Sequence, residues 1–295
     1  MRDDGRRCVR KPGGVGRILL FLGVVVGFAP ANVRLKPESV AQDLPAILER
    51  AAEYCDKLSR SVLNFVCRER IEEWFYLAEG PVDRWAGRNF LDRRRASNAL
   101  VYDYQLVRDR SGAIQETRTL LRENKKDVQV PGAPLKTHVF DYANVVMGPL
   151  GLLSRTNQPL HDYKIVGEEK IGGEPAVIIE AVPKPDLIVD HLFGRIWMRR
   201  KDAAIVKIEW NPASVGNYAK VEEIGRRFKM SPALLLTSEY AFEHNGIRFP
   251  NRYAIKENYF RKGGARFQRS ETTVLYDRYK FFTVETEIVY RGENP

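Results

Sequence analysis

Residues 235–259 read LLTSEYAFEHNGIRFPNRYAIKENY, and this stretch decides the fold class. Two runs in which apolar and polar residues alternate flank the dipeptide Asn245-Gly246. Asn-Gly strongly favours the two-residue turn of a β-hairpin, because both positions of that turn need a positive φ. The alternation places successive side chains on opposite faces of each strand. The stretch therefore predicts an antiparallel hairpin with a buried face.

Runs of the same kind predict four further hairpins around this one. Their paired runs are 99–108 with 113–122, 163–170 with 176–182, 193–199 with 204–210, and 266–276 with 281–290. A long strand with alternating charges is also predicted from residue 65 to 77. Five successive hairpins give one large sheet, which has to curl around something or be packed on one face. We therefore expect a mainly β, α+β fold: a large curled antiparallel sheet, or unclosed β-barrel, covered by two or three helices.

Apolar residues at helical spacing predict two helices that cover the sheet. The first, residues 43–60, has Pro45 in its first turn. The second, residues 137–153, is expected to be stopped by Gly148-Pro149. Residues 214–229 are charged and partly amphipathic, and their pattern leaves a strand and a short helix both open.

The first 31 residues predict a secretion signal. Basic residues precede an apolar run at 18–28, which is shorter than the ~20 residues needed to span a bilayer. Ala29-Pro30-Ala31 has the small-x-small pattern of a signal peptidase site. We expect cleavage after Ala31, a periplasmic or secreted location, and one mature domain at residues 32–295. An uncleaved N-terminal membrane anchor is the alternative.

The charge of the chain is basic, at +10 for the whole sequence. Residues 1–31 hold six basic and two acidic residues, so their removal leaves 42 basic and 36 acidic residues, a net charge of +6. This balance suits an anionic membrane surface or an acidic envelope partner. An exported location argues against nucleic acid. The role of the basic insert around Arg93, Arg94 and Arg95 stays open.

Two cysteines, Cys55 and Cys67, remain after cleavage. An even number of cysteines in an oxidising compartment predicts a structural disulfide between them. Two buried free thiols are the alternative. Without a nearby histidine, the pair supplies too few ligands for zinc.

Motifs for catalysis or cofactor binding are missing from the sequence. The four histidines form no His-Glu-x-x-His motif, and there is no Gly-x-Ser-x-Gly elbow and no glycine-rich phosphate loop. The acidic pairs Glu72-Glu73 and Glu222-Glu223 have oppositely charged neighbours, which predicts solvated faces. We expect a protein that is not an enzyme, with no cofactor and no metal.

The hairpins as a set resemble a known superfamily. Residues 166–173 (VGEEKIGG) lead into 176–181 (AVIIEA), residues 193–198 (FGRIWM) lead into 205–210 (IVKIEW), and residues 243–250 (EHNGIRFP) follow. Over roughly residues 45–290 the chain resembles the LolA/LolB-like periplasmic proteins, often labelled outer-membrane lipoprotein-sorting-like. The resemblance implies an unclosed β-barrel with helices over its concave side and an apolar cavity between them. It also implies a carrier or sensor of lipoprotein acyl chains. The extra hairpin at 99–122 departs from the carriers.

Aromatic residues recur inside the predicted strands. A sheet with apolar residues on both faces needs two covers, or one cover and a ligand. We therefore expect an apolar cavity that binds a lipid or a lipoprotein acyl chain, with positive charge at its mouth favouring an anionic headgroup. The candidates for its lining are Trp74, Tyr102, Tyr104, Trp197, Trp210, Tyr240 and Phe242. The alternative is a periplasmic interaction or sensor module whose core is filled by its own side chains; an enzyme with an unrecognised site is the third possibility.

Overall fold

The computed structural model describes most of the chain as one compact unit within Leu35–Pro295. The described residues are 37–61, 64–77, 95–108, 113–143, 145–185, 192–215 and 218–282. The predicted secretion signal, the basic residues Arg93 and Arg94, and the turn at 109–112 lie outside them.

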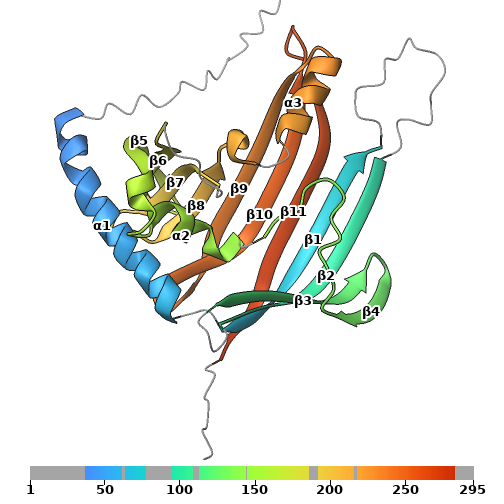
Figure 1. Cartoon of the computed structure of the whole chain (residues 1–295), viewed down its shortest axis with the longest axis horizontal. Helices are drawn as coiled ribbons and strands as arrows, with labels where there is room; N and C mark the ends of the chain where they lie inside the picture. Colours follow the sequence, from blue (N-terminus) through green and yellow to red (C-terminus); the bar gives the residue numbers. More distant parts are fainter. Residues whose placement is uncertain are drawn as a thin grey trace, which may run out of the picture. The chain divides into compact units, whose positions relative to one another are not determined.

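A single antiparallel sheet of eleven strands forms the described part of the fold (Figure 1). Its order is β4-β3-β2-β1-β11-β10-β9-β8-β7-β6-β5, and it is not closed, because β4 and β5 are edges. This confirms the predicted unclosed antiparallel sheet. The strands are β1 Phe65–Tyr76, β2 Arg95–Arg108, β3 Ile114–Glu123, β4 Lys126–Pro131, β5 His161–Ile171, β6 Glu174–Pro183, β7 Gly194–Arg199, β8 Ile205–Trp210, β9 Ser231–His244, β10 Ile247–Phe260 and β11 Arg266–Phe281.

The pairing of β1 with β11 joins the first and last parts of the sheet. The hairpin β9–β10 turns at Asn245 and Gly246, whose φ angles of 51° and 74° are those that the predicted turn requires. The predicted hairpins β2–β3, β5–β6 and β7–β8 also form. The short edge strand β4 has no counterpart in the predicted set.

The fifth predicted hairpin, 266–276 with 281–290, is wrong. Instead of turning after Tyr276, β11 continues to Phe281 and pairs with β1 as far as Phe65. The long β1 offers a partner over this whole length, so the polar residues 277–280 stay in the sheet. Residues 283–290 lie outside the described residues.

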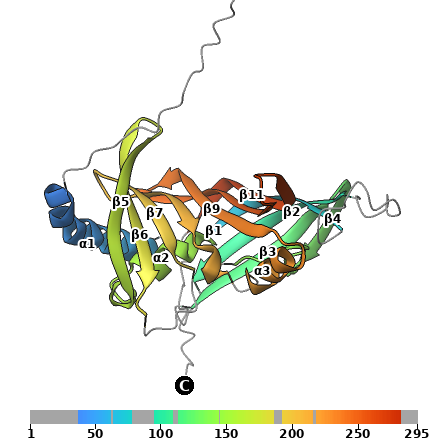
Figure 2. The same ribbon diagram turned by 90° about the horizontal axis from the view of Figure 1, so that it is seen from above.

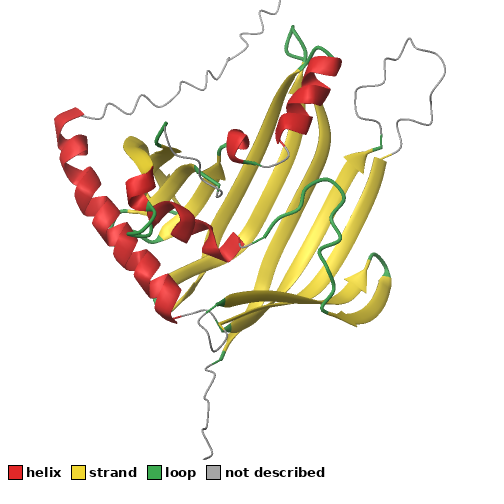
Figure 3. Ribbon diagram, in the orientation of Figure 1, coloured by secondary structure: helices red, strands yellow, loops and turns green. Residues whose placement is uncertain are grey.

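Three α-helices lie on one face of the sheet (Figures 2 and 3): α1 Pro37–Ser61, α2 Gly148–Leu153 and α3 Tyr218–Arg227. We call this the covered face. The α1 helix buries Ala51, Cys55 and Leu58, and the hydroxyl of Tyr54 accepts a hydrogen bond from the backbone N–H of Arg248 at 2.9 Å. The segment left undecided at 214–229 contains α3. Among the described helices, none combines the length and apolar character that a membrane span requires.

The helix predicted at 137–153 forms only in its second part. Residues 132–143 form an extended segment across the covered face, which we call the strap (Figure 3). Helical structure starts only with a 3₁₀ turn at Val145–Met147 and continues as α2. Pro149 therefore lies at the start of a helix and not at its end, because a residue in the first turn needs no N–H donor.

The predicted disulfide between Cys55 and Cys67 is not formed; both are buried free cysteines. They have different surroundings. The Cys55 Sγ lies 3.7 Å from the carbonyl oxygen of Pro149, whereas Cys67 is hydrogen-bonded with Tyr279. Burial raises the pKa of the Cys55 thiol to about 12 and also raises that of Cys67.

We predict that iodoacetamide leaves Cys55 and Cys67 unmodified in the folded protein and alkylates both in denaturant without reductant. The thiolate is the reactive form, and burial suppresses it in the fold. Peptide mass mapping measures each site separately. A disulfide between the two cysteines would protect them in denaturant as well, which would contradict the structure.

Candidate functional site

Two glutamates on the covered face of β1 hold the strap against the sheet. Glu73 is buried, and its carboxylate accepts hydrogen bonds from the backbone N–H of His138 at 2.9 Å and of Val139 at 3.1 Å. The Nδ1 atom of His138 lies 3.1 Å from the same carboxylate. The strap belongs to no helix or sheet ladder, so Glu73 supplies acceptors that its backbone would otherwise lack.

Glu69 makes the second connection. It is buried and accepts hydrogen bonds from Arg118 Nε at 2.7 Å and from the hydroxyls of Tyr142 and Tyr276, each at 3.0 Å. One carboxylate thus joins β1, β3, β11 and the strap. The pKa values of both tyrosines lie well above the ordinary range, because burial and then the charge of Glu69 disfavour a phenolate. The phenols stay neutral donors to Glu69.

The burial of Glu73 corrects the expectation that Glu72-Glu73 forms a solvated face. In β1 the residues Cys67, Glu69, Ile71 and Glu73 are buried, whereas Glu72 is exposed. Successive side chains of a strand point to opposite faces, so the two members of an acidic pair meet different surroundings.

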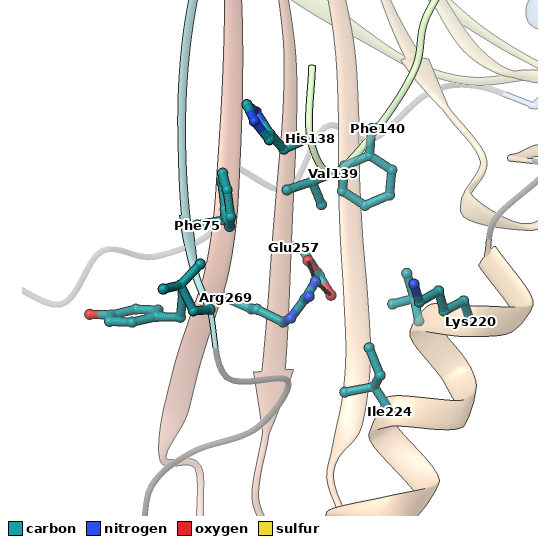
Figure 4. A pocket seen from close by; sticks show the side chains of 11 residues that line it. Phe75, His138, Val139, Phe140, Lys220, Ile224, Glu257 and Arg269 are labelled. Atoms are coloured by element: carbon teal, nitrogen blue, oxygen red, sulfur yellow. Dashed lines mark hydrogen bonds and ion pairs between the residues drawn. The ribbon is translucent and has the colours of Figure 1, made fainter. Parts of the chain in front are cut away.

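A pocket of about 270 Å³ lies where the strap, α3 and the end of β1 meet (Figure 4). Strands β10 and β11 contribute further lining residues. Apolar side chains form one part of the wall: Phe140, Val221 and Ile224 are buried, and Leu77 is 55% exposed. The residues that line it are Phe75, Tyr76, Leu77, His138, Val139, Phe140, Lys220, Val221, Ile224, Glu257 and Arg269.

Glu257 and Arg269 give the pocket a polar side. Glu257 is buried, and its two oxygens lie 3.1 and 2.8 Å from Arg269 Nη1. The hydroxyls of Tyr259 and Ser270 donate to the same carboxylate at 2.6 and 2.7 Å. Figure 4 shows the guanidinium beside the carboxylate, with Ile224 across from Val139. The Glu257 carboxylate is therefore fully satisfied by its own chain.

None of the seven aromatic residues predicted to line a cavity lines this pocket. Tyr102, Tyr104, Trp210 and Tyr240 belong to the main buried core. The hydroxyl of Tyr104 donates to Glu116 at 2.7 Å and that of Tyr240 to the carbonyl of Val145 at 3.1 Å. The hydroxyl of Tyr102 and the indole N–H of Trp210 are also hydrogen-bonded within the chain. These side chains fill the space under the helices and the strap.

The other three lie elsewhere. Trp74 alternates with Glu73 and so points away from the covered face, where Arg95 lies 4.1 Å above its ring. Trp197 belongs to a small separate cluster and donates to Glu169 at 2.8 Å. Phe242 is 37% exposed and stacks on Tyr279 with a centroid distance of 4.7 Å.

The pocket residues were missed by reasoning from the sequence. One signal was present: Glu257 occupies a position of period two with Tyr253, Ile255 and Tyr259, where an apolar residue is expected. An acid on a buried strand face needs a partner, and Arg269 on the adjacent strand is that partner. The contribution of Val139 depends on the path of the strap, which the helical periodicity concealed.

Within the described residues, no group of three or more His, Cys, Asp and Glu side chains comes together as a metal-binding cluster. The chemistry that the pocket offers is an apolar wall with one buried ion pair, an exposed lysine and a histidine. Such a lining is suited to non-covalent binding of a small amphipathic molecule.

Comparisons with known proteins give likenesses of fold only. No family model and no curated protein matches the chain. A solved structure of a DUF1329 family protein from Desulfovibrio piger matches at 9% identity with a TM-score of 0.37, over 82% of this chain and 94% of that one. A LolA superfamily protein from Nitrosomonas europaea matches at 15% identity with a TM-score of 0.33, over 83% and 95%.

A putative outer membrane lipoprotein-sorting protein domain from Vibrio parahaemolyticus matches at 12% identity with a TM-score of 0.35, over 81% of this chain and 94% of that one. A LolA superfamily protein and a lipoprotein-sorting domain are thus among the solved structures to which the chain is similar. At these identities and TM-scores the likenesses do not show what this chain binds.

We predict that Glu73→Gln loosens the strap. The amide has one acceptor fewer and carries a donor toward the N–H groups of His138 and Val139, so charge-assisted bonds are lost. Hydrogen exchange of these two amides should accelerate by about tenfold or more, which corresponds to ~1.4 kcal/mol. NMR-detected exchange measures it.

Glu72→Gln is the matched control, because Glu72 is adjacent in sequence but exposed on the opposite face. It should leave the exchange of both amides unchanged. Equal exchange in the two variants would show that Glu73 does not hold the strap.

Proposed function

We propose that this chain is an exported envelope protein that binds a single acyl chain, or a small amphiphile of similar size, without covalent chemistry. The ligand occupies the pocket between the strap, α3 and the end of β1. The observation that carries the proposal is the pocket's mixed lining: apolar side chains from the strap, α3 and β1, together with the Glu257–Arg269 ion pair, border a space that the core does not fill.

The size of the pocket limits the ligand. Ligand sites are commonly about 300–1,000 Å³, so the volume of about 270 Å³ lies just below this range. A water-sized group takes roughly 30 Å³, which allows about nine such groups. That is one short chain or the end of a longer one. A lipoprotein with several acyl chains could place only part of one chain here.

The affinity of such a site comes from burial. Each methylene removed from water contributes ~0.8 kcal/mol, so a handful of buried methylenes supplies several kcal/mol toward binding. The wall is partly pre-formed, because Glu73 fixes His138 and Val139 in place. A site held in its bound shape loses less conformational freedom on binding.

A second function is favoured by a different observation. Tyr102, Tyr104, Trp210 and Tyr240 fill the main core, which is what an interaction or sensor module with a self-filled core requires. The exposed edge of Phe242 would then belong to a partner surface. The two functions differ in whether the pocket beside Val139 takes up a ligand.

The remaining parts of the proposal come from the sequence. Cleavage after Ala31, a periplasmic or secreted location, a single domain at 32–295 and contact with an anionic membrane surface are part of it. So is the absence of catalysis. These parts are compatible with a protein that binds its ligand non-covalently in the pocket described above.

The test is native mass spectrometry of the protein purified without detergent, before and after addition of decanol or decanoate. We expect one bound molecule for each chain. Val139→Phe places extra volume in the pocket and should weaken uptake by about tenfold or more, because the ring takes the space of several methylenes.

Val182→Phe is the matched control, since Val182 is 43% exposed on β6 and does not line the pocket. It should bind like the parent protein. If neither amphiphile binds the parent, or if both variants bind equally well, the pocket is not the ligand site and the self-filled interaction module is the better account.

A further inference from the structure

The chain itself satisfies only some of the hydrogen-bond donors of the Arg269 guanidinium. Both of its hydrogen bonds to Glu257 are made by Nη1, end-on, at 3.1 and 2.8 Å. Its Nε is buried and has no hydrogen-bond partner among the described residues. A buried donor without a partner is destabilising, so a ligand atom that accepts a hydrogen bond from it gives a direct gain in binding free energy.

The unused side of this guanidinium has a particular shape. Nε and Nη2 form one edge of the planar group, with two parallel N–H donors. This edge pairs with a carboxylate or a phosphate through two parallel hydrogen bonds. Glu257 cannot serve it, because that carboxylate already binds Nη1, Tyr259 and Ser270.

The charges around the pocket favour an anion. Arg269 and Glu257 compensate each other as an ion pair. Lys220 is an exposed residue of α3 and adds a positive charge to the lining. The Nδ1 atom of His138 faces the carboxylate of Glu73, 3.1 Å away. A ligand anion at the free edge of Arg269 therefore meets a net positive lining.

We propose that the ligand of this pocket is a single-chain amphiphile with an anionic head, a carboxylate or a phosphate monoester, bound by the Nε and Nη2 edge of Arg269. Lys220 supplies the second positive charge. The chain of the amphiphile packs against Val139, Val221 and Ile224. This inference rests on the proposed function, because it names the class of ligand for the same pocket.

The experiment compares decanoate, decyl phosphate and decanol by isothermal titration calorimetry on the full protein. The three share their chain and differ in the head. We expect one or both anions to bind at least about tenfold more tightly than decanol, because charge-assisted bonds in a buried site are worth more than neutral ones. The two anionic arms show whether the edge prefers a carboxylate or a phosphate.

Variants show which residues produce the preference for an anionic head. Lys220→Met should lower the affinity for the preferred anion several-fold and leave decanol binding unchanged. Lys125→Met, an exposed lysine in the turn between β3 and β4, makes the same change of charge away from the pocket and should change neither.

Arg269→Met alone leaves the buried Glu257 without its partner, which is destabilising. The double variant Glu257→Gln with Arg269→Met removes the charge pair together. It should abolish the preference for anions and keep decanol binding, with thermal melting as the check of folding. If the double variant does not fold, the relative affinities of the parent protein for decanoate, decyl phosphate and decanol still test the proposal.

The outcomes separate the two proposals. If decanol and both anions bind equally well, the pocket binds chains but Arg269 does not select an anionic head, and this inference is overturned alone. If no amphiphile binds, the proposed function itself fails. A preference for anions that persists in the double variant would place the head elsewhere.

Discussion

Two buried carboxylates, Glu69 and Glu73, determine how the covered face of this sheet is closed. The strap has no hydrogen-bond ladder of its own, and a buried carboxylate needs donors. The strap and the two carboxylates therefore satisfy one another. Glu73 accepts hydrogen bonds from the backbone N–H groups of His138 and Val139, and Glu69 accepts one from the hydroxyl of Tyr142. Without the bonds to Glu73, the backbone N–H groups of His138 and Val139 would lose their acceptors.

The pocket follows from this arrangement. Glu73 fixes the strap where it crosses β1 and β11, and α3 lies beyond the strap on the same covered face. The lining of the space between them includes Val139 and Ile224, and the Glu257–Arg269 pair supplies part of its polar side. In the larger part of the covered face, α1 and α2 bring their own apolar side chains and fill the space. A single sheet thus carries a filled core and a small unfilled site side by side.

Much of the sheet could be predicted from the sequence because its signals are local. The turn at Asn245-Gly246 needs only the tolerance of both residues for positive φ, and the structure shows such angles there. The first part of the helix expected at 137–153 does not form, because its apolar periodicity competes with acceptors from β1, which lie more than sixty residues earlier. No window of sequence around His138 contains Glu73.

The site was less accessible to sequence reasoning for a related reason. In β1, charged residues occur on both faces, so alternation alone cannot show whether Glu73 or Trp74 points inward. The aromatic side chains chosen for a cavity are large enough to fill the core themselves, as Tyr104 and Tyr240 do. The pocket is lined by residues from segments that are distant in the sequence, and the path of the strap brings His138, Val139 and Phe140 to the others.

The central claim is that a ligand binds between the strap and α3. Isotope-filtered NMR on protein with labelled methyl groups and bound decanoate tests it most directly. The account predicts contacts from the ligand chain to the methyl groups of Val139, Val221 and Ile224, with a shift of the Arg269 Nε–H resonance. Contacts confined to other residues, such as those around Trp197 or Phe242, or no contacts at saturating ligand, would contradict it.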